Sequence, residues 1–123
     1  MLAAEKRTLR KKLGQLKDHE RILIKRKRLG NTQNQEAKRL GVSRYKYRKW
    51  EKGDLDKDTI VPKRLSNLGI FEICFLLRKR NNLTITKLAQ EIGVSKTWIC
   101  DMELGTAPIG DLVKYWIVRY AKS

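Results

Sequence analysis

The sequence predicts an all-α fold that contains two tandem copies of one small helical unit. The first observation behind this prediction is an internal repeat, since residues 21–53 and 73–105, paired without a gap, share ten identities. The second is that residues which begin and end helices fall at matching positions in both copies. The identical pairs are Arg26/Arg78, Lys27/Lys79, Arg28/Arg80, Thr32/Thr84, Ala37/Ala89, Gly41/Gly93, Val42/Val94, Ser43/Ser95, Glu51/Glu103 and Gly53/Gly105. Because they include capping and turn residues as well as basic ones, the repeat indicates the same core built twice.

Three helices are predicted in the first copy. Residues 21–29 have the pattern of a basic amphipathic helix. Thr32 is placed to cap a short second helix, and Gln35, three residues later, completes a capping box. Ser43 caps a third helix that runs to about residue 52 and that Gly53 ends. The second copy repeats these signals at Thr84, Gly93, Ser95 and Gly105.

Three further segments complete the predicted chain. Residues 1–19 are expected to form a basic N-terminal helix or arm, and residues 53–69 a short connector helix with Pro62 in its first turn. A closing helix is expected from Asp111 to about Ala121, and its apolar side either covers the second copy or meets a partner subunit in a homodimer. Its apolar residues are Leu112, Val113, Tyr115, Trp116, Ile117 and Tyr120. The predicted domains are 1–19, 20–69 and 70–123.

The chain carries a large and unevenly distributed positive charge. Its 29 Lys and Arg residues against 13 Asp and Glu give a net charge of +16, of which residues 1–64 hold +13 and residues 65–123 hold +3. A charge of this size favours a polyanionic partner, with nucleic acid first and an anionic membrane surface second. No stretch has the length of an apolar membrane span, and the N-terminus lacks the apolar segment of a secretion signal. We therefore expect no membrane insertion and a cytoplasmic location.

Few residues are available for catalysis or metal binding. The sequence has one histidine, His19, and two cysteines, Cys74 and Cys100, which lie in no metal-binding spacing. No set of nucleophile, base and orienting residue is recognisable, so we expect no enzymatic activity, no cofactor and no small-molecule ligand. Both cysteines are expected to be reduced thiols, with Cys74 in the core.

The third helix of the first copy should present a cationic outer face. Tyr47 and Trp50 are three residues apart, so both should point into the core. The opposite side then carries Arg44, Tyr45, Arg48, Lys49 and Lys52. Such a face is typical of a recognition helix that lies in the major groove of DNA, while the preceding helix points its N-terminus at a phosphate.

We expect these side chains to divide into base readers and phosphate contacts. Arg44 is the first choice for two parallel hydrogen bonds to guanine O6 and N7, and Lys49, further along the helix, is expected to reach another base or a phosphate. Tyr45 offers its ring to a thymine methyl and its hydroxyl to a phosphate. Phosphate contacts are expected from Gln33, Lys46 and Arg48.

The matching helix of the second copy is nearly neutral. Its outward residues are Lys96, Thr97, Cys100 and Asp101, with Trp98 on the flank. Either this copy reads bases through residues such as Lys96 and Thr97 with fewer phosphate contacts, or it serves as a scaffold.

The strings TQNQEAKRLGVSRYKYRKWEKG and LTITKLAQEIGVSKTWICDMELG resemble the helix-turn-helix of Cro and repressor proteins, the Xre family. The resemblance covers about residues 20–53 and 71–120. It implies a lambda-repressor-like fold for each copy and site-specific binding of double-stranded DNA, usually as a dimer on a palindrome. By position it implies a phosphate contact at Gln33 and base readers at Arg44, Tyr45 and Lys49. Two copies in one chain depart from the single-domain pattern and would allow one polypeptide to span two half-sites.

The expected function is that of a sequence-specific, DNA-binding transcription regulator, in the first instance a repressor of phage, plasmid or other mobile-element type. A DNA-binding accessory factor in replication or recombination would use the same surface, so this alternative stays open. A basic module that binds RNA or a membrane surface is the alternative from another class.

Overall fold

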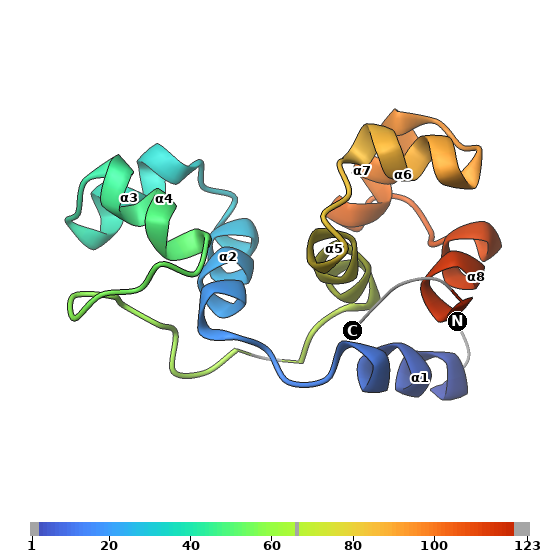
Figure 1. The fold of residues 1–123 in the computed structure, drawn as a ribbon, viewed down its shortest axis with the longest axis horizontal. Coiled ribbons are helices and arrows are strands. Elements are labelled where there is room, and N and C mark those ends of the chain that lie inside the picture. The colour runs from blue at the N-terminus through green and yellow to red at the C-terminus, as the bar shows by residue number, and fades with distance from the viewer. Residues whose placement is uncertain (1–2, 66, 120–123) are drawn as a thin grey trace. The chain divides into compact units, whose positions relative to one another are not determined.

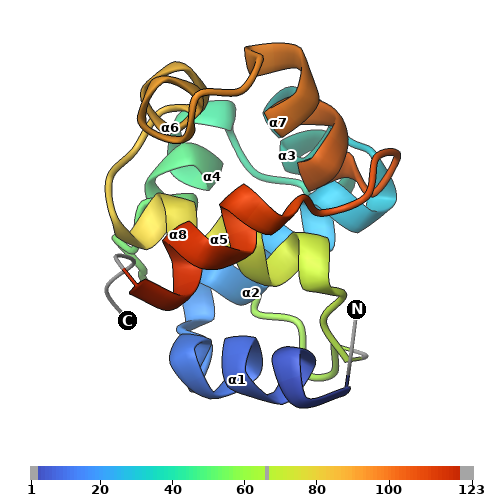
Figure 2. The same cartoon turned by 90° about the vertical axis from the view of Figure 1, so that its right-hand side faces the viewer.

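The computed structural model describes residues 3–65 and 67–119, and this part of the chain contains eight α-helices and no strand (Figures 1 and 2). The all-α prediction is therefore confirmed. The chain divides into two compact units. We call Gln15–Asn67 the central unit, and Met1–Gly14 together with Leu68–Ser123 the terminal unit. The polypeptide thus passes from one unit to the other twice.

Each unit contains one copy of the repeat. The central unit holds α2 (Asp18–Leu29), α3 (Gln33–Leu40) and α4 (Arg44–Glu51). The terminal unit holds α1 (Ala3–Leu13), α5 (Ile70–Arg80), α6 (Ile85–Ile92), α7 (Lys96–Leu104) and α8 (Asp111–Arg119). We refer to α2–α4 as the first repeat and to α5–α7 as the second repeat.

The predicted capping of the first repeat is confirmed. Thr32 Oγ1 accepts a hydrogen bond from Gln35 N at 3.2 Å, and Thr32 N donates to Gln35 Oε1 at 2.8 Å, which is the expected capping box of α3. Ser43 Oγ accepts from Lys46 N at 3.1 Å and so caps α4. Between the two helices Gly41 has a φ of 72°, a conformation that glycine adopts without a side-chain clash. The start and direction of α4 are thereby fixed by local hydrogen bonds.

The core of the central unit lies beneath α4. Tyr47 and Trp50 are fully buried, with their ring centroids 6.2 Å apart in an edge-to-face arrangement. They pack with Ile22 of α2 and Ala37 of α3 in one cluster. Their predicted inward orientation is confirmed, and it leaves the opposite side of α4 to solvent.

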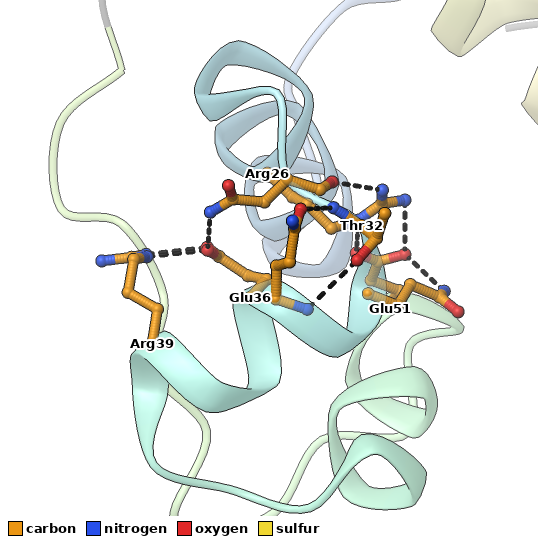
Figure 3. Close-up of polar contacts among 8 residues, drawn as sticks. Arg26, Thr32, Glu36, Arg39 and Glu51 are labelled. Atoms are coloured by element: carbon orange, nitrogen blue, oxygen red, sulfur yellow. Dashed lines mark hydrogen bonds and ion pairs between the residues drawn. The ribbon is translucent and has the colours of Figure 1, made fainter.

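The same Arg–Glu ion pair joins the first and third helices in both repeats, part-buried in the first and buried in the second. In the first repeat, Arg26 Nε donates to Glu51 Oε2 at 2.5 Å, and Arg26 Nη2 donates to Glu51 Oε1 at 3.1 Å (Figure 3). In the second repeat, Arg78 donates to Glu103 through the same atoms at 2.6 and 2.9 Å. A bidentate pair fixes both the distance and the orientation of the two helices that it joins.

The structural repeat extends beyond the aligned sequence at its N-terminal side. Lys17 N donates to Glu20 Oε1 at 2.9 Å at the start of α2, and Gly69 N donates to Glu72 Oε1 at 2.9 Å at the start of α5. Both glutamates are buried and stand 52 positions apart, like the other pairs. They therefore begin the first helix of each repeat in the same way.

One position shows how the repeats have diverged within a shared backbone. Gly30 ends α2 with a φ of 70°, and Asn82 stands at the matching position after α5 with a φ of 55°. A left-handed conformation is unfavourable for a residue with a Cβ atom, although asparagine tolerates it better than most.

We expect Asn82→Gly to raise the free energy of unfolding of the terminal unit by about 0.5 kcal/mol, because relief of backbone strain exceeds the added entropy of the unfolded chain. Hydrogen exchange measured by mass spectrometry on peptides from α5 and α6 would report the change in the terminal unit alone. Gly30→Asn is the matched control in the central unit and should lower stability by a similar amount. A clear loss of stability in Asn82→Gly would contradict the assignment of strain.

The prediction of a connector helix over residues 53–69 is wrong, because the described residues between α4 and α5 form turns and irregular segments. Arg21 explains part of the difference. Its guanidinium donates to the carbonyl of Pro62 at 2.9 and 3.2 Å and to that of Lys63 at 3.0 Å, so these carbonyls bond to α2. Val61 packs against the central core. Contacts with the rest of the unit thus hold the connector in a non-helical path.

The basic N-terminal segment forms a packed helix. Leu9 and Leu13 of α1 are buried, and α1 contacts α5 and α8 of the same unit. Arg80 donates from Nη1 to the carbonyl of Leu13. The segment predicted as a separate helix or arm therefore belongs to the terminal unit, and α2 begins at Asp18, three residues before the predicted start.

The closing helix α8 covers the second repeat with only part of its apolar side. Val113 and Ile117 are buried, whereas Leu112 and Tyr115 are about half exposed. Trp116 Nε1 donates to Glu91 Oε2 at 3.1 Å, which connects α8 to α6. Tyr120 lies outside the described residues. The predicted burial of Cys74 is confirmed, and burial raises the pKa of its thiol to about 12.

Candidate nucleic-acid interface

The outward side of α4 forms an exposed cationic surface. Arg44, Tyr45, Arg48 and Lys49 are all exposed, and 71% of the surface of Tyr45 is accessible to solvent. Arg44 and Arg48 form no ion pair with any described residue, so their guanidinium groups keep all their donors for a ligand. We name these four residues the α4 face. The structure brings them together as the sequence predicts, opposite the buried Tyr47 and Trp50.

Tyr45 and Lys49 support one another on this face. Lys49 Nζ lies 4.8 Å from the centre of the Tyr45 ring, within the range of a cation–π contact. The residues are four positions apart, which places them one turn apart on the same side of the helix. The contact places a positive charge, which suits a phosphate, beside an aromatic ring, which suits the edge of a base.

Lys46, predicted as a phosphate contact, is engaged by acidic residues of the connector. Its Nζ lies 2.6 Å from Asp58 Oδ2 and 3.9 Å from Asp56 Oδ2, and the hydrogen bond to Asp58 raises the pKa of Lys46. Lys49 Nζ also lies 4.0 Å from Asp54 Oδ2. The three aspartates therefore reduce the positive charge at one edge of the α4 face. The alternation GDLDKD in the sequence was the signal for this contact, because it places acidic residues directly after a basic helix.

We expect Asp58→Asn to strengthen binding to any duplex, because Lys46 would then be free to pair with a phosphate. The plot of log K against log salt should become steeper by about 0.9, the contribution of one additional phosphate contact. Fluorescence anisotropy of a labelled duplex over a range of salt concentrations would measure this. Asp18→Asn at the start of α2 removes the same formal charge from an exposed side chain that pairs with no basic group among the described residues, and it should leave the slope unchanged. Equal slopes in the wild type and both variants would contradict the proposed competition.

Gln33 occupies the first position of α3. Its Nε2 donates to Glu51 Oε1 at 3.0 Å, so the ion pair with Arg26 also orients this amide. One amide hydrogen and the amide oxygen of Gln33 remain for a ligand. The N–H groups of Gln33 and Asn34 have no acceptor within the helix, because the first turn of a helix always leaves its amides free. This is the group that was predicted to meet a phosphate.

A second polar cluster, centred on Glu36, connects α3 to the turn that precedes it. Glu36 is buried and accepts from Arg39 Nε and Nη2, both at 2.7 Å, and from Asn31 Nδ2 at 3.0 Å (Figure 3). The hydrogen bonds from Arg39 hold the pKa of Glu36 below its usual range, despite the opposing effect of burial. Glu36 therefore stays ionised at neutral pH and keeps α3 attached to the end of α2.

The matching surface of the second repeat is different in chemistry. Lys96 and Thr97, the predicted contacts, are exposed at the start of α7, whereas Cys100 and Asp101 are half-buried. The cap is preserved, since Ser95 Oγ accepts from Trp98 N at 3.1 Å. Trp98 itself is half-buried and packs near Gly110. It is therefore not exposed in the way that a side chain inserted between DNA bases would need to be.

Neither a metal centre nor a membrane segment is found in the described part of the chain. No group of three or more His, Cys, Asp or Glu side chains is placed to hold a metal ion among residues 3–65 and 67–119. Over the same residues, none of the helices combines the length and the apolar composition that crossing a bilayer requires.

Comparisons with protein-family models, with curated proteins and with solved structures yield no match to this chain. The assignment of the α4 face therefore depends on the chain's own residues and on the physical chemistry of their arrangement.

Proposed function

We propose that the protein is a sequence-specific, double-stranded DNA-binding transcription regulator, and that each repeat is a lambda-repressor-like helix-turn-helix. The observation that carries the proposal is the α4 face, a capped helix with Arg44, Tyr45, Arg48 and Lys49 exposed above a buried Tyr47 and Trp50. In a helix-turn-helix the second helix enters the major groove. A short helix that is rigidly anchored on one side and cationic on the other fits that role.

The neighbouring α3 would contribute the phosphate contact. Gln33 and the free amides at the start of α3 suit a phosphate oxygen, and the pair of Glu51 with Arg26 orients the Gln33 side chain. The surplus of positive charge in residues 1–64 supports attraction to the DNA backbone. The resemblance to Cro and repressor proteins supports a role at promoters, with repression as the proposed outcome.

The test is to select bound sites from a random duplex library and then to compare two matched arginine variants. Arg44→Ala should relax the preference at one base position by about tenfold, because a bidentate contact to guanine contributes discrimination of that order. Arg48→Ala should weaken all sequences alike, because a phosphate contact carries no base information. Circular dichroism would show that both variants keep their helix content.

Selection of no preferred sequence would overturn the proposed function, as would a preference for structured RNA or for anionic vesicles over duplex DNA. Loss of preference at the same base in both arginine variants would contradict the division of roles. A footprint of the protein on its selected sites would separate a promoter from a replication origin or a recombination site.

A further inference from the structure

The two repeats share a frame of polar contacts between their first and third helices. Each has the Arg–Glu ion pair, with Nε to Oε2 distances of 2.5 Å in the first repeat and 2.6 Å in the second. Each arginine also donates from Nη1 to a backbone carbonyl, Arg26 to Asn31 at 3.1 Å and Arg78 to Leu83 at 2.7 Å. These acceptors are again 52 positions apart. The second repeat therefore has the same ion pair and the same arginine-to-carbonyl hydrogen bond as the first, and these contacts connect its third helix to its first.

The outward residues of the two third helices, by contrast, differ at every matched position. The four pairs are Arg44/Lys96, Tyr45/Thr97, Arg48/Cys100 and Lys49/Asp101. The α4 face consists of donors and one ring, which suit guanine acceptors and a thymine methyl. Thr97 and Asp101 add a small hydroxyl and an acceptor, and a carboxylate suits the N4 amino group of cytosine. Two surfaces so different in chemistry would select different base sequences.

The second repeat also has a hollow whose lining is basic and hydroxylic. A hollow of about 570 Å³ lies where α5 ends and where α6 and α7 begin, and Lys79, Thr84, Thr86 and Lys96 contribute to its lining. Arg78 lines it too, but Glu103 balances the charge of Arg78. The two exposed lysines therefore leave the hollow with positive charge beside hydroxyl donors. This combination favours a DNA-contacting role for the second repeat over a purely structural one.

We propose that one chain binds a non-palindromic duplex in which the two repeats read two different half-sites, without need of a second copy. The inference rests on the proposed function and specifies its substrate. Two identical subunits read one half-site twice and require a palindrome, whereas one chain with two unlike surfaces requires an asymmetric target. Because the repeats are covalently joined, the second contact forms at a high effective concentration once the first has formed.

The test combines site selection with a surface graft. The full-length protein is used to select sites from a random duplex library, and native mass spectrometry counts the chains on the selected duplex. We expect an asymmetric site with two different elements and one chain per duplex. Thr97→Ala with Asp101→Ala should reduce the preference for one element by about tenfold and leave the other intact.

The graft replaces the outward residues of α7 by those of the α4 face through Lys96→Arg, Thr97→Tyr, Cys100→Arg and Asp101→Lys. We expect the graft to select the α4-face element twice. Lys96 and Thr97 are exposed and Cys100 and Asp101 are half-buried, and none of the four belongs to the Arg78–Glu103 pair, so the frame keeps its contacts. Circular dichroism would verify the fold. If the double substitution disrupts folding, Thr97→Ala alone, at an exposed position of α7, serves as the second variant, with a smaller loss of preference at the same element.

Three results would overturn the inference, and they can be told apart. The first is a palindrome occupied by two chains, and the second is a single element whose selection does not change when α7 is substituted. Either result would refute the asymmetric site while leaving the proposed DNA-binding function in place. Selection of no sequence at all would remove the proposed function and this inference together.

Discussion

Replacement of Glu103 by Gln is expected to lower the free energy of unfolding of the terminal unit by about 3–5 kcal/mol. The side chains of Arg78 and Glu103 are only 6% and 5% exposed, so loss of the carboxylate charge leaves a guanidinium buried without its counterion. Hydrogen exchange measured by mass spectrometry on peptides from α5 and α7 would report the change locally. Such a readout is needed because the two units need not unfold together.

Two further variants show whether the effect comes from the unpaired charge. Glu51→Gln removes the matching carboxylate in the first repeat and should cost less, because Arg26 is 19% exposed and can recover water contacts. The double variant Arg78→Met with Glu103→Leu should restore much of the lost stability, since an apolar pair carries no uncompensated charge. Unchanged exchange in Glu103→Gln would show that the pair does not stabilise the frame.

Local features of the fold were predictable from the sequence where one residue type satisfies one local requirement. Thr32, Gln35 and Ser43 act as caps because their side chains reach backbone amides within the same turn. The inward orientation of Tyr47 and Trp50 follows from helical periodicity alone. These predictions involve neighbours in the chain, and the structure confirms them.

Features that depend on distant partners were missed. The sequence repeat preserves Arg26/Arg78 and Glu51/Glu103, but nothing in either string states that an arginine bonds a glutamate 25 positions away. The available signal was that both the arginine and the glutamate are identical in the two copies, although most of the aligned positions differ. The packing of α1 on α5 was hidden in the same way, because Leu9 and Leu13 suit any apolar surface.

The connector shows tertiary contacts overriding a local pattern. Pro62 fits the first turn of a helix, yet its carbonyl is taken by Arg21 from α2. The acidic residues ahead of it turn toward Lys46 of α4. For the candidate site, the sequence was sufficient to predict which residues of α4 face outward, but not that one of its lysines is held by Asp58.

The affinity of the protein for its selected duplex is expected to fall about 1,000-fold between 50 and 200 mM salt, if about six phosphates are neutralised. Lys and Arg side chains that pair with phosphates release condensed counterions, and added salt opposes that release. The exposed Arg48 and Lys49 on α4 and Lys79 and Lys96 in the second repeat would supply a large part of these contacts. Anisotropy titrations at several salt concentrations would give the slope.

The slope also tests individual side chains. Arg48→Ala should make it shallower by about 0.9, and Lys96→Ala should do the same if the second repeat grips the backbone. Each variant removes one charge of the same sign. Lys57→Ala therefore serves as the control for net charge alone, because Lys57 is an exposed connector residue that pairs with no other described residue. If Lys57→Ala changes the slope as much as Arg48→Ala does, the attraction is a property of the total charge, and the α4 face has no special place in it. A slope near zero in the wild type would mean that phosphates are not the partner of these side chains.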